Sequence, residues 1–99
     1  MKALHVAWLA SIATAALCVA ATADESAIHL RDGAEAATVT ANCSGCHSLD
    51  YIQMNARFMK RAGWEAEVKK MVSVMGAPVS DADATRIVDY LTREYGIAE

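Results

Sequence analysis

The chain lacks the features that divide a protein into several domains. Its 99 residues include 1 proline and 5 glycines, and they contain no proline-, glycine- or serine-rich linker, internal repeat or low-complexity segment. No run alternates apolar and polar residues in the manner of a half-buried β-strand. These absences exclude a repeat or multidomain architecture and leave a single helical domain as the expected fold.

Positive charge is also scarce. The chain has 9 lysines and arginines against 12 aspartates and glutamates, which gives a formal net charge of −3. Proteins that bind nucleic acid through phosphate contacts need an excess of positive charge. The composition therefore disfavours nucleic acid as a partner.

A long apolar run occurs once, from about residue 6 to residue 21, behind a lysine and ahead of the triplet Ala21-Thr22-Ala23. The run is rich in alanine and short for a membrane span, and the pattern is typical of a secretory signal peptide. We predict that residues 1–23 are a signal peptide and that residues 24–99 form the mature domain. The protein is then expected in the periplasm, with no membrane anchor after cleavage.

Cysteine is nearly absent from the predicted mature domain. Of the 3 cysteines, Cys18 belongs to the predicted signal peptide, and the other two lie in the segment Cys43-Ser44-Gly45-Cys46-His47. This C-x-x-C-H spacing is typical of haem attachment. Each thiol can form a thioether with one vinyl group of a porphyrin, and the following imidazole can bind the iron. The motif predicts one covalent haem c, held by Cys43 and Cys46, with His47 as the proximal iron ligand.

Three other interpretations of this motif are open. A redox-active C-x-x-C is expected in a thioredoxin-like βαβ unit, and the sequence shows no strand pattern. A zinc site needs four ligands, so the two cysteines would have to recruit His29 and His47, although His47 directly follows Cys46. The third interpretation is a local disulfide.

The predicted mature domain is small. Residues 24–99 number 76 and carry a net charge of −4, because the removed segment contains one lysine and no acidic residue. A hydrophobic core of this size is marginal without a covalent or cofactor staple. A covalently held haem would supply the missing core, and haem c is attached outside the cytoplasm, in agreement with the predicted export.

The first half of the mature domain gives weak helix signals. Small residues between Gly33 and Ser44 predict a helix that leads into the haem motif. Residues 24–33 are expected to form a lead-in, and residues 48–63 a connector in which Tyr51 packs near the haem.

Two stronger helices follow. Residues 64–75 show a helical period of apolar residues, with a stop signal at Gly76 and Pro78. Residues 80–95 begin with an acidic capping box, Ser80 with Asp83, and Gly96 fits the position after the helix. The apolar faces are Trp64, Val68, Met71, Val72 and Met75 in the first, and Ala84, Ile87, Val88, Leu91 and Tyr95 in the second.

Charged residues on these two segments predict helical ion pairs four residues apart. Glu65 is expected to pair with Lys69, and Asp89 with Arg93. The sequence thus predicts an all-α fold of three or four helices wrapped around one haem.

The second axial ligand of the iron is left open by the spacing. A thioether there would raise the reduction potential and make the site an electron carrier. The mature domain offers Met54, Met59, Met71 and Met75. Met71 and Met75 lie on the apolar face that must cover the haem, and the spacing does not choose between them.

Several segments beyond the motif carry a resemblance to a known family. They are residues 43–52 (CSGCHSLDYI), Trp64, residues 67–71 (EVKKM), residues 75–78 (MGAP), Asp83, Tyr90-Leu91 and Tyr95-Gly96. Over residues 42–96 the chain resembles a bacterial class I-type cytochrome c. More narrowly, it is similar to the small cytochrome subunit of periplasmic sulfite dehydrogenases.

This resemblance implies the small cytochrome c fold and a molybdenum-containing catalytic subunit as partner. It also implies Met71 as the distal iron ligand. The residue before Gly-Ala-Pro is often tyrosine in the family, whereas this chain has Met75, which makes Met75 the alternative ligand.

Electron transfer is the expected function, with no catalysis by the chain itself and with a downstream cytochrome c or oxidase as acceptor. The basic group Arg57, Lys60 and Arg61 is expected at the rim of the docking surface. The alternatives are a free-standing periplasmic carrier for another dehydrogenase and a haem-based sensor with an open axial site. A peroxidase-like cytochrome would need a distal acid–base group, for which His29 is the only other histidine of residues 24–99.

Overall fold

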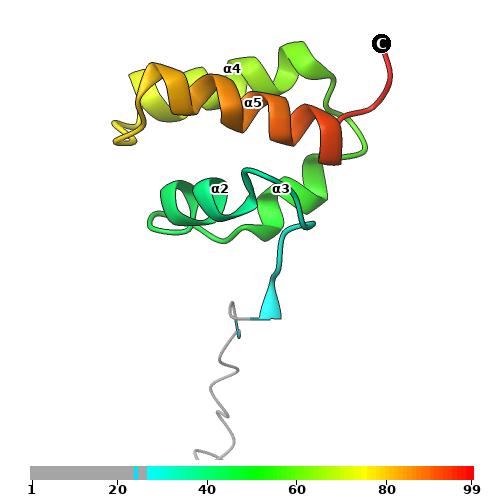
Figure 1. Ribbon diagram of the computed structural model, residues 1–99, viewed down its shortest axis with the longest axis horizontal. Coiled ribbons are helices and arrows are strands. Elements are labelled where there is room, and N and C mark those ends of the chain that lie inside the picture. Colours follow the sequence, from blue (N-terminus) through cyan, green and yellow to red (C-terminus); the bar gives the residue numbers. More distant parts are fainter. Residues whose placement is uncertain (1–23, 25–26) are drawn as a thin grey trace, which may run out of the picture.

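Four helices make up the part of the chain described by the computed structural model, which comprises residue 24 and residues 27–99. They are α2 (Ala36–Cys43), α3 (Asp50–Asn55), α4 (Arg61–Ser73) and α5 (Asp81–Tyr95). Helices α4 and α5 lie against each other, and α2 packs on α5 (Figure 1). Residues 27–99 contain no β-strand, so the all-helical prediction is confirmed for them.

The predicted signal peptide, residues 1–23, lies outside the described residues. Among the helices that the structure describes, none combines the length and apolar character needed to cross a bilayer.

Helix α5 begins at the predicted cap. The Ser80 hydroxyl oxygen accepts a hydrogen bond from the Asp83 backbone N–H at 3.1 Å and donates one to the Asp83 carboxylate at 3.0 Å. Asp81 and Asp83 also place negative charge in the first turn, where the helix dipole favours it. The apolar face of α5 is buried as the period predicts, and its buried members are Ile87, Val88, Leu91 and Tyr95.

Glycines end both long helices, for different reasons. Beyond α4, Gly76 has φ +75°, a left-handed conformation that favours glycine, and the Ala77 N–H donates to the Met71 carbonyl at 2.9 Å. Gly96 directly follows α5 as predicted, and its φ is −78°. A Cβ atom there would collide with the Thr92 carbonyl oxygen, and close packing is why this position suits glycine.

Helix α3 occupies six residues of the stretch that the sequence predicted as a connector. Its first backbone N–H, from Asp50, donates to the Ser48 hydroxyl oxygen at 3.2 Å, and its buried residue is Ile52. Leu49, which precedes the helix, is 7% exposed. Two neighbouring apolar anchors therefore hold a helix that is too short to show a helical period.

Helix α4 starts at Arg61, three residues earlier than the predicted start at Trp64. Arg61 therefore lies in its first turn and forms ion pairs that the sequence did not predict. Arg61 in the first turn pairs with Glu65 at 3.0 Å and with Asp89 of α5 at 2.7 Å. The predicted pairs of Glu65 with Lys69 and of Asp89 with Arg93 are therefore wrong. The Arg61 guanidinium binds both carboxylates because α4 packs against α5 and so brings Asp89 within reach. The sequence of either helix alone does not reveal this packing.

The core gathers side chains from all four helices. Trp64, at 1% exposure, is the largest side chain in it. The buried cluster consists of Val39, Leu49, Ile52, Trp64, Ile87, Tyr90, Leu91 and Tyr95. Partly buried residues, among them Met59 and Val68, pack against it.

The lead-in before α2 is fastened to α5. The Arg31 backbone N–H donates to the Tyr95 hydroxyl at 2.7 Å, and the Tyr90 hydroxyl donates to the Arg31 carbonyl. The Arg31 guanidinium lies 5.0 Å from the centre of the Tyr95 ring and also bonds the Glu94 carbonyl. These contacts join the segment before α2 to the C-terminal half of α5.

Candidate functional site

The C-x-x-C-H motif lies where α2 ends, at the left of Figure 1. Cys43 is the last residue of the helix and packs half-buried against the core. The next three residues form a turn, and Cys46 and His47 are exposed. Helix α2 therefore fixes the first thiol and leaves the second thiol and the imidazole accessible at the surface.

The His47 imidazole is held in a defined orientation. Its Nδ1 lies 2.9 Å from the Ser48 carbonyl oxygen. A carbonyl can only accept, so Nδ1 carries the proton and donates. The Nε2 atom is then the basic nitrogen, as required of a histidine that binds a metal through Nε2.

The two thiols are free, since neither forms a disulfide within the described part of the chain. Burial raises the pKa of the Cys43 thiol, and the neighbouring Cys46 adds to the increase. Redox-active C-x-x-C pairs need the opposite, a thiol whose pKa is lowered. The geometry thus gives no support to the disulfide or thioredoxin-like interpretation.

The zinc interpretation also lacks support. Within the residues that the structure describes, no three His, Cys, Asp or Glu side chains come together as a group that could hold a metal ion. His29 is exposed, and its backbone carbonyl accepts a hydrogen bond from the Gln53 side chain at 3.0 Å. The second histidine of the domain is therefore not recruited to the two cysteines.

The two candidate methionines lie near the end of α4, at the same end of the molecule as the motif turn (Figure 1). Met71 is half-buried within the helix. Met75 follows the helix directly before Gly76 and is 69% exposed. Both could supply a thioether to an iron bound by His47, and the geometry leaves the choice between them open.

Large apolar side chains are uncovered on the segments near this end and along α3. Met54 is 63% exposed, and Val74 is 75% exposed. Phe58, in the connector after α3, is 72% exposed. Exposed apolar groups in a domain this small mark surface that a ligand or partner can cover.

The indole N–H of Trp64 provides a further test of whether the residues of the chain suit a haem. The Trp64 indole Nε1 is buried and has no hydrogen-bond partner in the described part of the chain. An unsatisfied buried N–H costs about 1–3 kcal/mol. A haem carboxylate is a suitable acceptor for such a donor, and the free thiols and the Nε2 atom of His47 have the chemistry that attachment of this cofactor needs.

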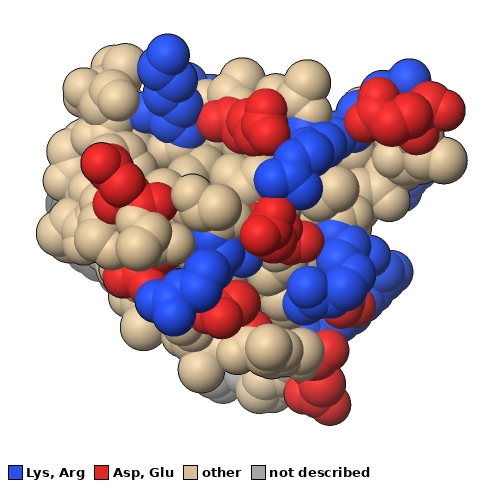
Figure 2. Space-filling view, turned by 45° about the horizontal axis from the view of Figure 1, so that its top comes forward, with Lys and Arg blue, Asp and Glu red and all other residues tan. Residues whose placement is uncertain are grey.

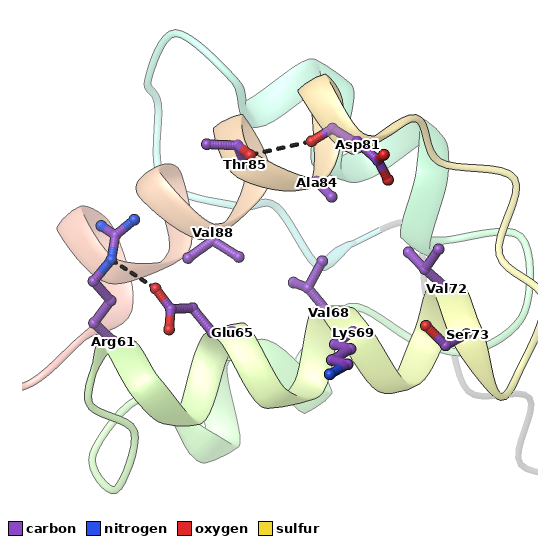
Figure 3. A pocket seen from close by; sticks show the side chains of 10 residues that line it. All are labelled: Arg61, Glu65, Val68, Lys69, Val72, Ser73, Asp81, Ala84, Thr85 and Val88. Atoms are coloured by element: carbon purple, nitrogen blue, oxygen red, sulfur yellow. Dashed lines mark hydrogen bonds and ion pairs between the residues drawn. The ribbon is translucent and has the colours of Figure 1, made fainter.

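A hollow on the surface lies between α4 and α5 (Figure 3). It is an open groove of about 270 Å³ with an apolar floor that includes Val68, Val72 and Val88. The Arg61–Glu65 pair lies at one end of it. None of its lining residues belongs to the motif or supplies a thioether, so the groove is separate from the candidate site.

Charge is evenly mixed on the face of the molecule shown in Figure 2, where positive and negative side chains alternate. Of the predicted basic group, Arg61 is neutralised by its two acidic partners. Arg57 instead lies over the Phe58 ring, 5.8 Å from its centre. Neither Arg57 nor Lys60 has an ion pair with a described residue, so these two carry the exposed positive charge of the group.

The sequence did not reveal two groups that contact His47. The Ser48 carbonyl is a backbone group and leaves no sequence signal. Tyr51, expected near the haem, packs its ring edge-to-face on His47, with centroids 5.8 Å apart. The spacing of four residues between them is the signal that could have indicated this pair.

No protein-family model matches the chain, and no curated protein has a matching sequence.

Proposed function

We propose that the chain is a monohaem c-type cytochrome that carries single electrons in the periplasm. The observation that supports this most strongly is the turn that ends α2. There, two free thiols stand beside an imidazole whose Nδ1 is occupied by the Ser48 carbonyl. The resemblance of residues 42–96 to bacterial cytochromes c is the reason for proposing electron transfer as the function.

The chain's own residues attach and hold the cofactor. Cys43 and Cys46 would hold the group through thioethers, each S–H adding across one vinyl group so that sulfur and hydrogen bond to its two carbons and no oxidant is needed. His47 would bind the iron through Nε2, and Met71 would supply a second ligand, with Met75 as the alternative. When bound, haem c would supply reversible one-electron chemistry at its iron. Trp64 would offer its buried indole N–H to a carboxylate of the group.

The proposed function is electron transfer without catalysis by the chain itself. Peroxide cleavage would need an acid–base group over the iron, and His29, the other histidine of the domain, is bound by its backbone to α3 and exposed. Substrate oxidation is assigned to a partner. By its resemblance, that partner is the molybdenum-containing catalytic subunit of a sulfite dehydrogenase, and a downstream cytochrome c or oxidase takes the electron on.

Covalent attachment can be tested with the exported chain, produced in a host that matures c-type cytochromes. The protein should carry one haem per chain that survives denaturation, with the pyridine haemochrome spectrum of two thioether links. Cys18→Ala, which changes the cysteine outside the motif, is the matched control and should retain the haem. A mature protein that leaves the host without covalent haem would overturn the proposal.

The ligand state separates a carrier from a sensor. A carrier with two protein ligands should keep its ferrous spectrum when carbon monoxide is added, because the distal position is filled. A spectrum that changes within mixing time would favour the haem-based sensor.

The partner is tested by mixing the chain with the catalytic subunit of a molybdenum-containing sulfite dehydrogenase. Sulfite should reduce the haem rapidly only when both proteins are present. Without reduction, the chain would be a free-standing carrier for another dehydrogenase.

A further inference from the structure

The ring of Tyr51 is the side chain that packs on the His47 imidazole. The two ring centroids are 5.8 Å apart and the planes meet at 63°, an edge-to-face arrangement. His47 is exposed, so few other atoms restrain its ring. The contact with Tyr51 is therefore a main restraint on the orientation of the His47 imidazole.

A single hydrogen bond does not fix an imidazole. The bond from Nδ1 to the Ser48 carbonyl selects the tautomer and one direction of the ring. The ring can still pivot about that bond, which would swing Nε2 away from a metal. A second contact on the ring, at an angle to the first, removes this freedom.

Tyr51 is itself well held. It lies in the first turn of α3, where the Asn55 side-chain amide donates to its carbonyl at 2.8 Å. The next residue, Ile52, is buried and anchors the same turn of the helix in the core. The backbone that carries the Tyr51 ring is thereby fixed beside His47.

We infer that Tyr51 is a positioning residue, whose ring holds the His47 imidazole in the plane that presents Nε2 to the haem iron. The inference rests on the proposed function, because an imidazole needs a fixed plane here only if it binds a metal. The aromatic ring, rather than the hydroxyl, makes the contact, so phenylalanine should replace tyrosine without loss.

The experiment compares Tyr51→Phe, Tyr51→Leu and Tyr51→Ala in the holoprotein, with Phe58→Ala as control. Phe58 is an aromatic residue of similar size that is even more exposed than Tyr51, at 72% against 40%. The g values of the ferric form in electron paramagnetic resonance report the orientation of the axial ligands, and the reduction potential reports the ligand field. We expect Tyr51→Leu and Tyr51→Ala to shift both, and Tyr51→Phe and Phe58→Ala to match the parent protein.

Identical g values and potentials in all four variants would overturn the inference and leave haem binding intact. A shift in Tyr51→Phe would also overturn it, because the hydroxyl would then be the active group. Tyr51→Leu keeps the position filled if Tyr51→Ala fails to fold.

If the parent chain carries no haem, the proposed function fails by itself. Nitrogen-15 shifts of His47 in the chain as isolated then test the contact separately. Tyr51→Leu should change these shifts, because the ring is then free to pivot about its Nδ1 hydrogen bond, and Tyr51→Phe should not. Unchanged shifts in Tyr51→Leu would overturn the inference as well.

Discussion

Two methionine residues, Met71 and Met75, differ in how firmly the structure holds them as candidates for the proposed distal ligand. Met71 is half-buried in α4 on the same face as Trp64, and its carbonyl receives the Ala77 N–H where the helix ends. Met75 stands outside the helix beside the left-handed Gly76, with 69% of its surface exposed. The helix therefore restrains Met71 more than Met75, and a restrained ligand loses less entropy on binding.

The two methionines can be told apart by substitution. Met71→Ala should abolish the sulfur-to-iron charge-transfer band and lower the reduction potential, because a thioether ligand raises that potential. Met75→Ala should retain both and serves as the matched control. Loss of the band in Met75→Ala alone would move the assignment to Met75.

Among the elements, α5 depends on the cap at its start. Ser80→Ala removes the acceptor of the Asp83 N–H and should lower the free energy of unfolding by about 1 kcal/mol, measured by chemical denaturation. Ser73→Ala, an exposed serine at the end of α4, is the control and should change it by less than about 0.5 kcal/mol. Equal effects from the two would show that the cap contributes nothing.

The same cap gives α5 a dependence on pH. The pKa of Asp83 is lowered below its usual 3.8 by hydrogen bonds from Arg86 and then from Ser80. A carboxyl group whose pKa is lower in the folded state stabilises the fold above pH 3.8, and this contribution is lost as the pH falls through the folded value. Asp83→Asn should therefore flatten the acid limb of the stability curve, measured by thermal unfolding between pH 2 and pH 6. An unchanged acid limb would show that the pair is fully screened by solvent.

How much of these elements could be predicted depends on their length and their neighbours. Helix α5 was predictable because it carries its own cap and a full apolar face. Helix α3 was not, since six residues hold less than two turns and show no period. The Arg61–Asp89 pair spans 28 residues of sequence and follows from the packing of α4 on α5, which no local rule contains.

The residues of the candidate site also differ in how far the sequence alone indicated them. Cys43, Cys46 and His47 could be proposed from the sequence because the motif is contiguous and its spacing suits a porphyrin edge, and their role in holding a haem stays a prediction. The backbone partner of His47 and the orphaned Trp64 donor depend on folded geometry, so only the structure reveals them.

The stability of the whole molecule is expected to depend on the proposed haem. The buried cluster of the described part comprises eight residues, a small core for a domain of this length. The variant Cys43→Ala/Cys46→Ala should contain no covalent haem and should be largely unfolded at room temperature, as judged by far-ultraviolet circular dichroism. A double variant that stays folded without haem would contradict this dependence.

Association with an electron-transfer partner is also a property of the whole surface. Because Arg61 is bound by two carboxylates, Arg57 and Lys60 carry the positive charge that can steer a partner. Arg57→Gln/Lys60→Gln should slow haem reduction by the dehydrogenase and weaken its salt dependence, with the absorption spectrum unchanged. Lys69→Gln, an exposed lysine on α4, is the control. A double variant that keeps the parent's rate and salt dependence would place the docking surface elsewhere.

The packing of α2 on α5 also sets an order of events in time. Residues 81–95 follow α2 in the chain, so Val39 of α2 cannot be buried against them until they have been synthesised. Until then α2 lacks the surface on which it packs, and docking of α5 ends that interval. A chain that stops before Asp81 should be cleaved by protease within α2, whereas the full chain should resist cleavage there.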